Sequence, residues 1–170
     1  MPQYTEQVTQ YIPHLRRYAR ALMGSDILAA DDLVQDCLER ALSRMHLWRR
    51  GSDLRAWLFT IMHNLYANHI RKLSTSPQFV ELEPDKNAMS DNSSAEQELE
   101  IRDIQQAIST LAPDQREVLL LVTLEGLQYR EVATILGMPE GTVMSKLSRA
   151  RDKLRTIMQL EKPNRLRRVK

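Results

Sequence analysis

Cysteine and glycine are both scarce in this sequence. A single cysteine, Cys37, excludes an internal disulfide and fits a reducing compartment. Because Cys37 falls on an apolar helical stripe, we expect a buried thiol and not a reactive one. Five glycines are present, and neither G-x-x-x-x-G-K-[ST] nor G-x-G-x-x-G occurs, so a phosphate-cradling loop of either type is excluded.

Long hydrophobic runs are also missing. The longest, Val118–Val122, is far shorter than the ~20 residues that a membrane-spanning helix needs. The first ten residues, MPQYTEQVTQ, lack the basic start and apolar segment of a secretion signal. We therefore expect a cytoplasmic protein with no direct membrane insertion. His63 and His69 lie on different faces of one predicted helix, so we expect no metal site there, and nothing in the sequence indicates a cofactor.

Charge is segregated along the chain, although the formal net charge is only +2. Residues 25–42 carry five acidic residues and one basic residue, and residues 81–103 carry eight acidic and two basic. Residues 44–73 carry six basic and one acidic, and residues 140–170 carry ten basic and three acidic. Such blocks are often simply solvated faces. Their alternation in sign also indicates several partners, two of them polyanionic.

Helical periodicity predicts an all-α protein made of two small helical bundles joined by a flexible linker. We expect a short amphipathic helix that ends near Gly24 and carries a stripe of Leu15, Tyr18, Ala19 and Leu22. A longer helix is expected over Asp31–Leu47, and a third over Leu54–Leu73 with Asp53 or Ser52 as its N-cap. Ser74–Ala95 is rich in Ser, Pro, Asn and Asp and lacks a sustained period, which is typical of a linker. The predicted division is a first lobe over residues 1–73, a linker over 74–95, a second lobe over 96–160 and a basic tail over 161–170.

The predicted helix Asp31–Leu47 has one apolar face and one acidic face. The acidic face can be a solvated helix start, since Asp31 and Asp32 suit the positive end of the helix dipole. It can also be a docking surface for a basic partner. A third interpretation is Mg²⁺ coordination, because DD-x-x-x-D with Asp36 looks like the diphosphate-binding motif of helical prenyl synthases. The chain carries one such motif and is too short for that bundle.

The predicted helix Leu54–Leu73 combines apolar residues with aromatic, amide and cationic side chains. Apolar residues at this spacing normally pack inward. Aromatic rings interleaved with amides and cations also suit single-stranded DNA, because bases stack on rings while cations follow the phosphates.

Residues 124–155, LEGLQYREVATILGMPEGTVMSKLSRARDKLR, predict two short helices with a sharp turn between them. Gly137 can take the positive φ of a helix end, and Pro139 fits the first turn of the next helix. Val143, Leu147, Ala150, Leu154 and Ile157 form the predicted buried stripe of that second helix. Its outer face carries small hydrogen-bonding residues and Arg, which suits entry into a DNA major groove. An ordinary helical hairpin with a basic face is the alternative.

Three ordered segments resemble the bacterial extracytoplasmic-function (ECF, group IV) RNA polymerase sigma factors of the sigma-70 family. They are LRRYARALMGSDILAADDLVQDCLERAL, DLRAWLFTIMHNLYANHIRKL and LAPDQREVLLLVTLEGLQYREVATILGMPEGTVMSKLSRARDKLR. The resemblance covers about residues 8–158. It implies a sigma-2-like domain for the first lobe, a sigma-4-like helix-turn-helix domain for the second, and no enzymatic activity.

The resemblance also implies partners and roles. An acidic helix of such proteins docks on the β′ clamp helices of core RNA polymerase, and the second lobe binds the β-flap. Expected core-polymerase contacts are Asp32, Leu33, Gln35, Asp36 and Glu39. Expected contacts to the minus-10 promoter element are Arg49, Arg50, Phe59, His63, Asn64, Tyr66 and Arg71. Expected contacts to minus-35 DNA are Thr142, Met144, Ser145, Lys146, Ser148, Arg149, Arg151 and Lys153. An anti-sigma factor is a further expected partner, with stress response as the setting.

Some positions depart from the commoner family pattern. Met144 stands where Arg is frequent, Lys146 replaces a usual Arg, and Ser148 stands where an aromatic residue or His often occurs. Because these positions lie on the DNA-reading helix, the promoter sequence does not carry over from the family. The alternative function is a helix-turn-helix regulator that acts without replacing the specificity subunit of the polymerase.

Overall fold

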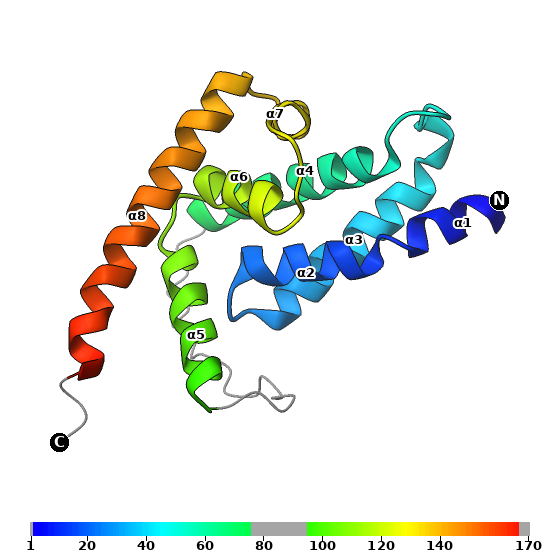
Figure 1. The fold of residues 1–170 in the computed structure, drawn as a ribbon. Helices are drawn as coiled ribbons and strands as arrows, with labels where there is room; N and C mark the ends of the chain where they lie inside the picture. Colours follow the sequence, from blue (N-terminus) through cyan, green and yellow to red (C-terminus); the bar gives the residue numbers. More distant parts are fainter. Residues whose placement is uncertain (1, 76–94, 167–170) are drawn as a thin grey trace.

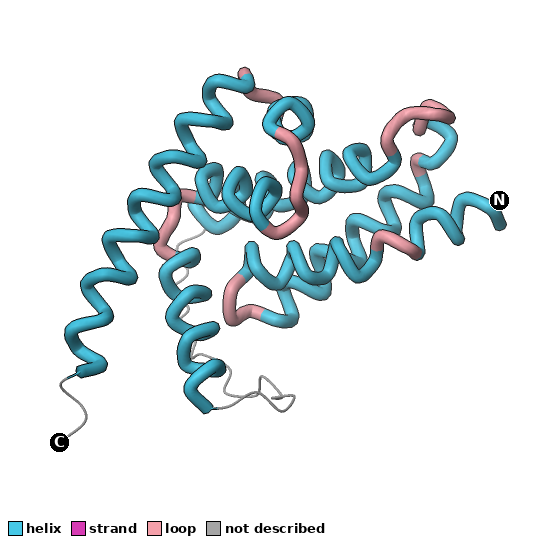
Figure 2. The backbone as a smooth tube through the Cα atoms, in the orientation of Figure 1, coloured by secondary structure: helices cyan, strands magenta, loops and turns pink. Residues whose placement is uncertain are grey.

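The computed structural model describes residues 2–75 and 95–166, and every regular element within them is a helix. The first lobe comprises α1 (Pro2–Thr9), α2 (Ile12–Met23), α3 (Ile27–Ser43), the 3-10 helix η1 (Met45–Leu47) and α4 (Leu54–Thr75). The second lobe comprises α5 (Ala95–Ser109), α6 (Pro113–Thr123), α7 (Tyr129–Leu136) and α8 (Glu140–Leu166). The predicted all-α class is confirmed (Figures 1 and 2).

Two of the predicted boundaries meet the edges of the described structure. The linker predicted over residues 74–95 falls outside the described residues except at its two ends. Helix α8 runs on to Leu166, so it includes the first part of the segment predicted as a basic tail.

Local sequence signals explain where the helices begin and end. The Asp26 side chain accepts a hydrogen bond from the Ala29 N–H at the start of α3, at 2.9 Å. Asp53, an N-cap candidate from the sequence, accepts one from the Ala56 N–H at 3.2 Å. Each carboxylate satisfies a backbone donor that the helix itself leaves without a partner.

The core of the first lobe is formed by the apolar faces of three helices. Helix α2 buries the predicted stripe of Leu15, Tyr18, Ala19 and Leu22. Cys37 is buried on the inward face of helix α3, as expected for that thiol. Tyr18 packs edge-on against Phe59 of α4, with ring centroids 5.2 Å apart. These contacts fix α2 and α3 side by side beneath α4 (Figure 1).

Helix α6 explains why the longest apolar run of the sequence occurs where it does. Leu119, Leu120 and Leu121 are all buried, although consecutive residues point to different sides of a helix. One side of α6 packs on α8, and another packs on α2 of the first lobe. In addition, α7 packs on α4, and the buried residues of the two lobes form one continuous hydrophobic cluster. The two predicted bundles are therefore docked on each other.

Candidate nucleic-acid interface

The acidic side chains of α3 point away from the core of the first lobe. Asp32, Asp36 and Glu39 are exposed, and the Gln35 amide donates to Glu39 Oε1 at 3.1 Å. Leu33, which was expected to contact a partner, is instead only 5% exposed and belongs to the core. In this conformation the residue lies on the inward stripe of the helix, so its contact with a partner stays a prediction.

Cationic groups line the loop before α4 and the outer side of that helix. Arg49 and Arg50 are exposed, and the Arg50 guanidinium lies 5.4 Å from the centre of the Tyr4 ring. Farther along α4, Asn64 and Arg71 are exposed as well. These four predicted minus-10 residues are open to a ligand.

Two predicted minus-10 residues are not accessible. Phe59 and Tyr66 are each 1% exposed. Phe59 packs on Tyr18, and the Tyr66 hydroxyl accepts from Arg116 Nη1 of the second lobe at 3.4 Å. In this conformation neither ring is open to a base, so their expected role as stacking surfaces stays a prediction. Aromatic rings interleaved with polar residues suggested a DNA-binding face, but packing against other helices decides which face is covered.

His63 lies within the predicted minus-10 set, yet its contact is with the second lobe. Its Nδ1 lies 2.9 Å from both Oε1 and Oε2 of Glu117 on α6. Glu117 is 4% exposed. Burial raises the pKa of this carboxyl, and the neighbouring His63 lowers it to a smaller extent.

A second buried carboxylate of the second lobe binds two arginines and a histidine of the first. Glu125 follows α6, and its side chain is fully buried. Arg17 Nη2 lies 3.0 Å from Oε1, while His14 Nδ1 and Arg55 Nη2 lie 3.1 Å and 3.2 Å from Oε2. Arg17 also donates to the Leu124 carbonyl, and Arg55 donates to the Glu125 carbonyl. All five contacts join the two lobes.

Arg116 of α6 makes a third polar contact between the lobes. Its guanidinium donates to the Leu22 carbonyl of α2 at 3.0 Å. The same group donates to the carbonyls of Ile108, Ser109 and Leu111, which close the α5–α6 turn. A single side chain therefore fixes that turn and holds it against the first lobe.

Sequence reasoning missed these contacts between the lobes. Neither Glu117 nor Glu125 was predicted to contact the first lobe. One signal was available. Glu117 and Glu125 flank the apolar run Val118–Val122, the first within α6 and the second just after its end. Carboxylates in such surroundings need charged partners from another element.

The second helix of the predicted helix-turn-helix is α8, and its buried and outer faces lie where the sequence places them. Gly137 ends α7 with φ +64°, and Val143, Leu147 and Ala150 are buried. Ser145, Ser148 and Arg149 are exposed on the opposite side, with Thr142 half-buried. The Ser145 hydroxyl donates to the Thr142 carbonyl of the same helix at 3.1 Å.

Two lysines of α8 are engaged within the second lobe. Lys146 forms an ion pair with Asp114 at the start of α6, and this pair lowers the pKa of that carboxyl. Lys153 donates to the Thr110 carbonyl at 2.6 Å. Both lysines were expected to contact minus-35 DNA, and in this conformation they hold α8 against the α5–α6 turn.

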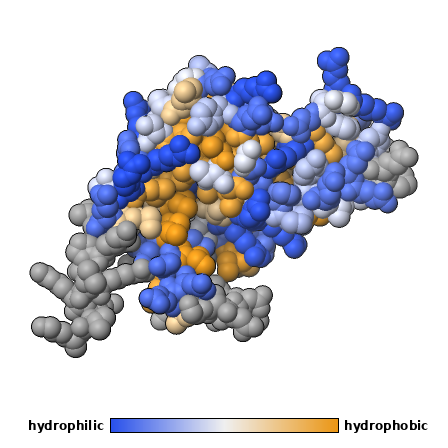
Figure 3. Space-filling model, in the orientation of Figure 1, coloured by the Kyte–Doolittle hydropathy of each residue, from blue (hydrophilic) through white to orange (hydrophobic). Residues whose placement is uncertain are grey.

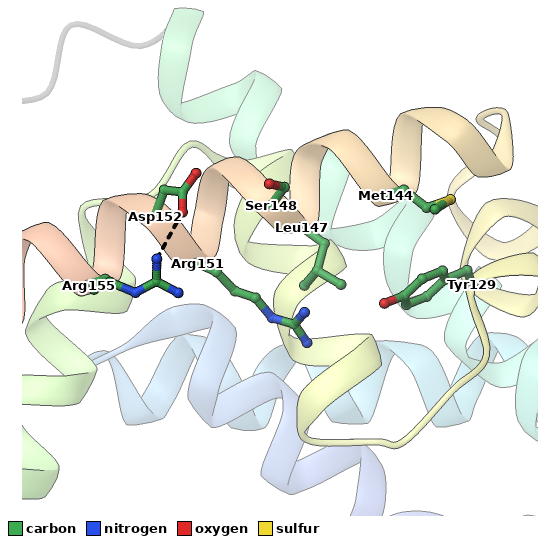
Figure 4. Close-up of a pocket in the computed structure, with 7 residues that line it drawn as sticks. All are labelled: Tyr129, Met144, Leu147, Ser148, Arg151, Asp152 and Arg155. Atoms are coloured by element: carbon green, nitrogen blue, oxygen red, sulfur yellow. Dashed lines mark hydrogen bonds and ion pairs between the residues drawn. The ribbon is translucent and has the colours of Figure 1, made fainter.

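A shallow hollow runs along α8 beside the start of α7 (Figure 4). Its lining comprises Tyr129, Met144, Leu147, Ser148, Arg151, Asp152 and Arg155. The Met144 side chain and the Tyr129 ring border one end, and Met144 is 53% exposed. Asp152 and Arg155 form an ion pair at 3.4 Å at the other end. Figure 3 shows hydrophilic residues along much of α8 and hydrophobic residues between α8 and α5.

Metal sites and membrane-spanning helices are both absent from the described part of the chain. There, no group of three or more His, Cys, Asp or Glu side chains is arranged to hold a metal ion. None of the described helices combines the length and apolar character needed to cross a membrane.

Comparison with known proteins identifies the family. The model of the Sigma2 domain of PhyR matches residues 8–63, and that of Sigma-70, region 4 matches residues 101–154. The ECF RNA polymerase sigma factor EcfG of Rhodopseudomonas palustris is 35% identical over 92% of this chain and 85% of that protein. The ECF RNA polymerase sigma factor SigC of Mycobacterium tuberculosis is 34% identical over 76% of this chain and 70% of that protein.

A solved structure agrees with these relatives. The sigma factor RpoE of Bartonella quintana, determined in complex with the anti-sigma factor NepR, is 30% identical in sequence. Its TM-score is 0.77, and the alignment covers 94% of this chain and 98% of RpoE. The order of the two matched modules also agrees with the two lobes described above. The chain belongs to the ECF RNA polymerase sigma factors.

Proposed function

We propose that this sigma factor binds core RNA polymerase through the acidic face of α3 and carries promoter contacts on α4 and α8. The observation that carries the proposal is the division of exposed charge between these helices. Asp32, Asp36 and Glu39 form an acidic surface on α3, whereas exposed Arg side chains lie before and along α4 and along α8. Acidic groups suit a basic protein surface, and Arg suits phosphates and base edges.

The first lobe, residues 1–73, is then the sigma-2-like unit, and residues 96–160 form the sigma-4-like unit. In this assignment the loop before α4 and the exposed side of α4 contact the minus-10 element, while α8 contacts the minus-35 element. Melting costs a few kcal/mol per unstacked base, which a site that holds the displaced base offsets. The protein acts by binding, without a chemical step of its own.

An anti-sigma factor is part of the same proposal. RpoE of B. quintana, which resembles this chain over nearly its whole length, was determined bound to the anti-sigma factor NepR. We infer a comparable inhibitory partner for this chain, acting in the cytoplasm.

The experiment is transcription in vitro from genomic DNA with core RNA polymerase plus this protein. We expect new, discrete start sites that depend on the protein. The variant Asp36→Lys with Glu39→Lys should remain folded and lose both core binding and transcription, because two cations would face a basic partner. Glu6→Lys, an exposed charge reversal on α1, is the control. Full core binding by the double variant would remove α3 from the interface.

A further inference from the structure

The contacts around Glu125 place a ready-made oxyanion-binding site on the first lobe. Arg17 and His14 come from α2, and Arg55 comes from the start of α4. The ligands they hold are all oxygens: the Glu125 carboxylate and the carbonyls of Leu124 and Glu125. Two guanidinium groups and an imidazole around one anion match phosphate as well as carboxylate.

The site is built into the first lobe. The Arg55 guanidinium also lies 5.9 Å from the centre of the buried Phe59 ring, a cation–π distance that helps to orient it. Arg17 and His14 are one helical turn apart on α2, with Arg17 Nη2 3.3 Å from His14 Nδ1. Their helices are fixed to each other by the core of the first lobe.

The location of this site links it to DNA. Arg55 and His63 lie on the same helix, α4, which carries the predicted minus-10 contacts. The second lobe covers both residues with a carboxylate, Glu125 on Arg55 and Glu117 on His63. The closed arrangement thus places acidic oxygens against α4 where a DNA backbone would otherwise lie.

The docked lobes cannot serve both promoter elements at once. The positions that name the minus-35 and minus-10 elements differ by about 25 base pairs, or ~85 Å at about 3.4 Å per base pair. A lobe of about 70 residues has a radius of gyration of only ~11 Å. The lobes must therefore separate to reach both elements, and separation removes Glu125 from His14, Arg17 and Arg55.

We propose that His14, Arg17 and Arg55 form a binding site for a backbone phosphate of promoter DNA, and that Glu125 occupies this site in the closed form. This inference rests on the proposed function, because promoter DNA is the ligand. It adds three residues to the DNA-binding surface, and it assigns Glu125 as an intramolecular competitor of DNA.

The test measures affinity of the full chain for a short fluorescein-labelled duplex of mixed sequence by anisotropy, across a salt series. Small-angle scattering reports the radius of gyration of the same samples. Glu125→Gln removes the competing charge, so we expect a larger radius and DNA affinity at least ~5-fold higher, since apparent affinity scales with the open fraction. Glu125→Asp keeps the negative charge on a shorter side chain. We expect it to increase the radius and the DNA affinity less than Glu125→Gln does.

The phosphate site itself is tested in the Glu125→Gln background. Adding Arg17→Gln should reverse most of the gain in affinity and lower the salt slope by roughly one unit, as expected for one lost phosphate contact. Adding Arg16→Gln, an exposed arginine on the same helix that does not contact Glu125, is the matched control. Equal affinities for the two double variants would overturn the phosphate site. An unchanged radius and affinity in Glu125→Gln would overturn the competition.

These outcomes are separate from those of the proposed function. The duplex-binding and scattering measurements contain no polymerase, so their results do not depend on the proposed polymerase contacts. Absence of transcription with core polymerase would contradict the sigma-factor roles assigned above, and the comparison between the two double variants would still decide whether Arg17 binds phosphate.

Discussion

At the residue scale, the two buried glutamates of the second lobe have unequal surroundings. Glu125 has two guanidinium partners and an imidazole, whereas Glu117 has one imidazole. Burial without full compensation explains why the pKa of Glu117 is raised. A carboxyl with a raised pKa favours the docked, folded state when it is protonated, so this residue makes stability depend on pH.

The sign of that dependence follows from proton linkage. Above the ordinary pKa of 4.5, folded Glu117 retains a proton that the unfolded chain has lost. Its contribution to stability is therefore fully present below about pH 4.5 and is lost as pH rises through the raised pKa. We expect the free energy of unfolding of wild type, relative to Glu117→Gln, to fall over this range by about 1.4 kcal/mol per unit of pKa shift.

Urea unfolding of both proteins at a series of pH values is the measurement. His63→Gln provides a control, because it removes the imidazole that lowers the pKa of Glu117. The loss of stability should then continue to a higher pH. Parallel pH profiles for wild type and Glu117→Gln would show that this carboxyl does not titrate differently in the two states.

Cys37 gives a second prediction at this scale. Burial raises the pKa of its thiol to about 12, and its Sγ lies 3.6 Å from the Leu58 carbonyl. Because the thiolate is the reactive form, we expect native protein to react with a disulfide reagent at pH 8 far more slowly than protein unfolded in urea. The absorbance of the coloured thiol that the reagent releases follows both reactions. Equal rates would mean that this part of the core opens readily.

At the element scale, two arginines of α8 lie on different sides of the helix, which favours different kinds of DNA contact. Arg149 is exposed opposite the buried stripe, whereas Arg151 lines the hollow beside α7. A side chain on the outermost face can reach base edges, and one on the flank is better placed for phosphates. Lys146 and Lys153 are already held by Asp114 and the Thr110 carbonyl, so they are weaker candidates for phosphate contacts than the sequence indicated.

The matching prediction compares two arginines. Arg149→Ala should cost about 1–3 kcal/mol on the cognate minus-35 sequence and relax preference at one or two base pairs. Arg151→Ala should weaken binding to all sequences alike and lower the salt slope by roughly one unit. Anisotropy with cognate and scrambled duplexes separates the two. An equal loss on both duplexes for Arg149→Ala would make it a backbone contact.

At the scale of the whole molecule, the sequence predicted the helices but did not specify that the two lobes dock on each other. The stripe of α2, the turn at Gly137 and the buried face of α8 depend on neighbours a few residues away, so periodicity reveals them. The burial of Tyr66 and Glu117 depends on a helix about 50 residues distant. No local pattern specifies that contact. For the same reason, the predicted minus-10 face included both accessible and covered residues.

The docking of the lobes has a consequence for how the protein responds to the amounts of its partners. Docking joins two parts of one chain, so dilution of the protein leaves the closed fraction unchanged. Binding of polymerase or DNA to the open form, in contrast, increases with the concentration of either partner. The apparent dissociation constant for such a partner is the intrinsic constant divided by the open fraction. The contacts of Glu117 and Glu125 between the lobes thereby set the partner concentration below which most chains stay closed.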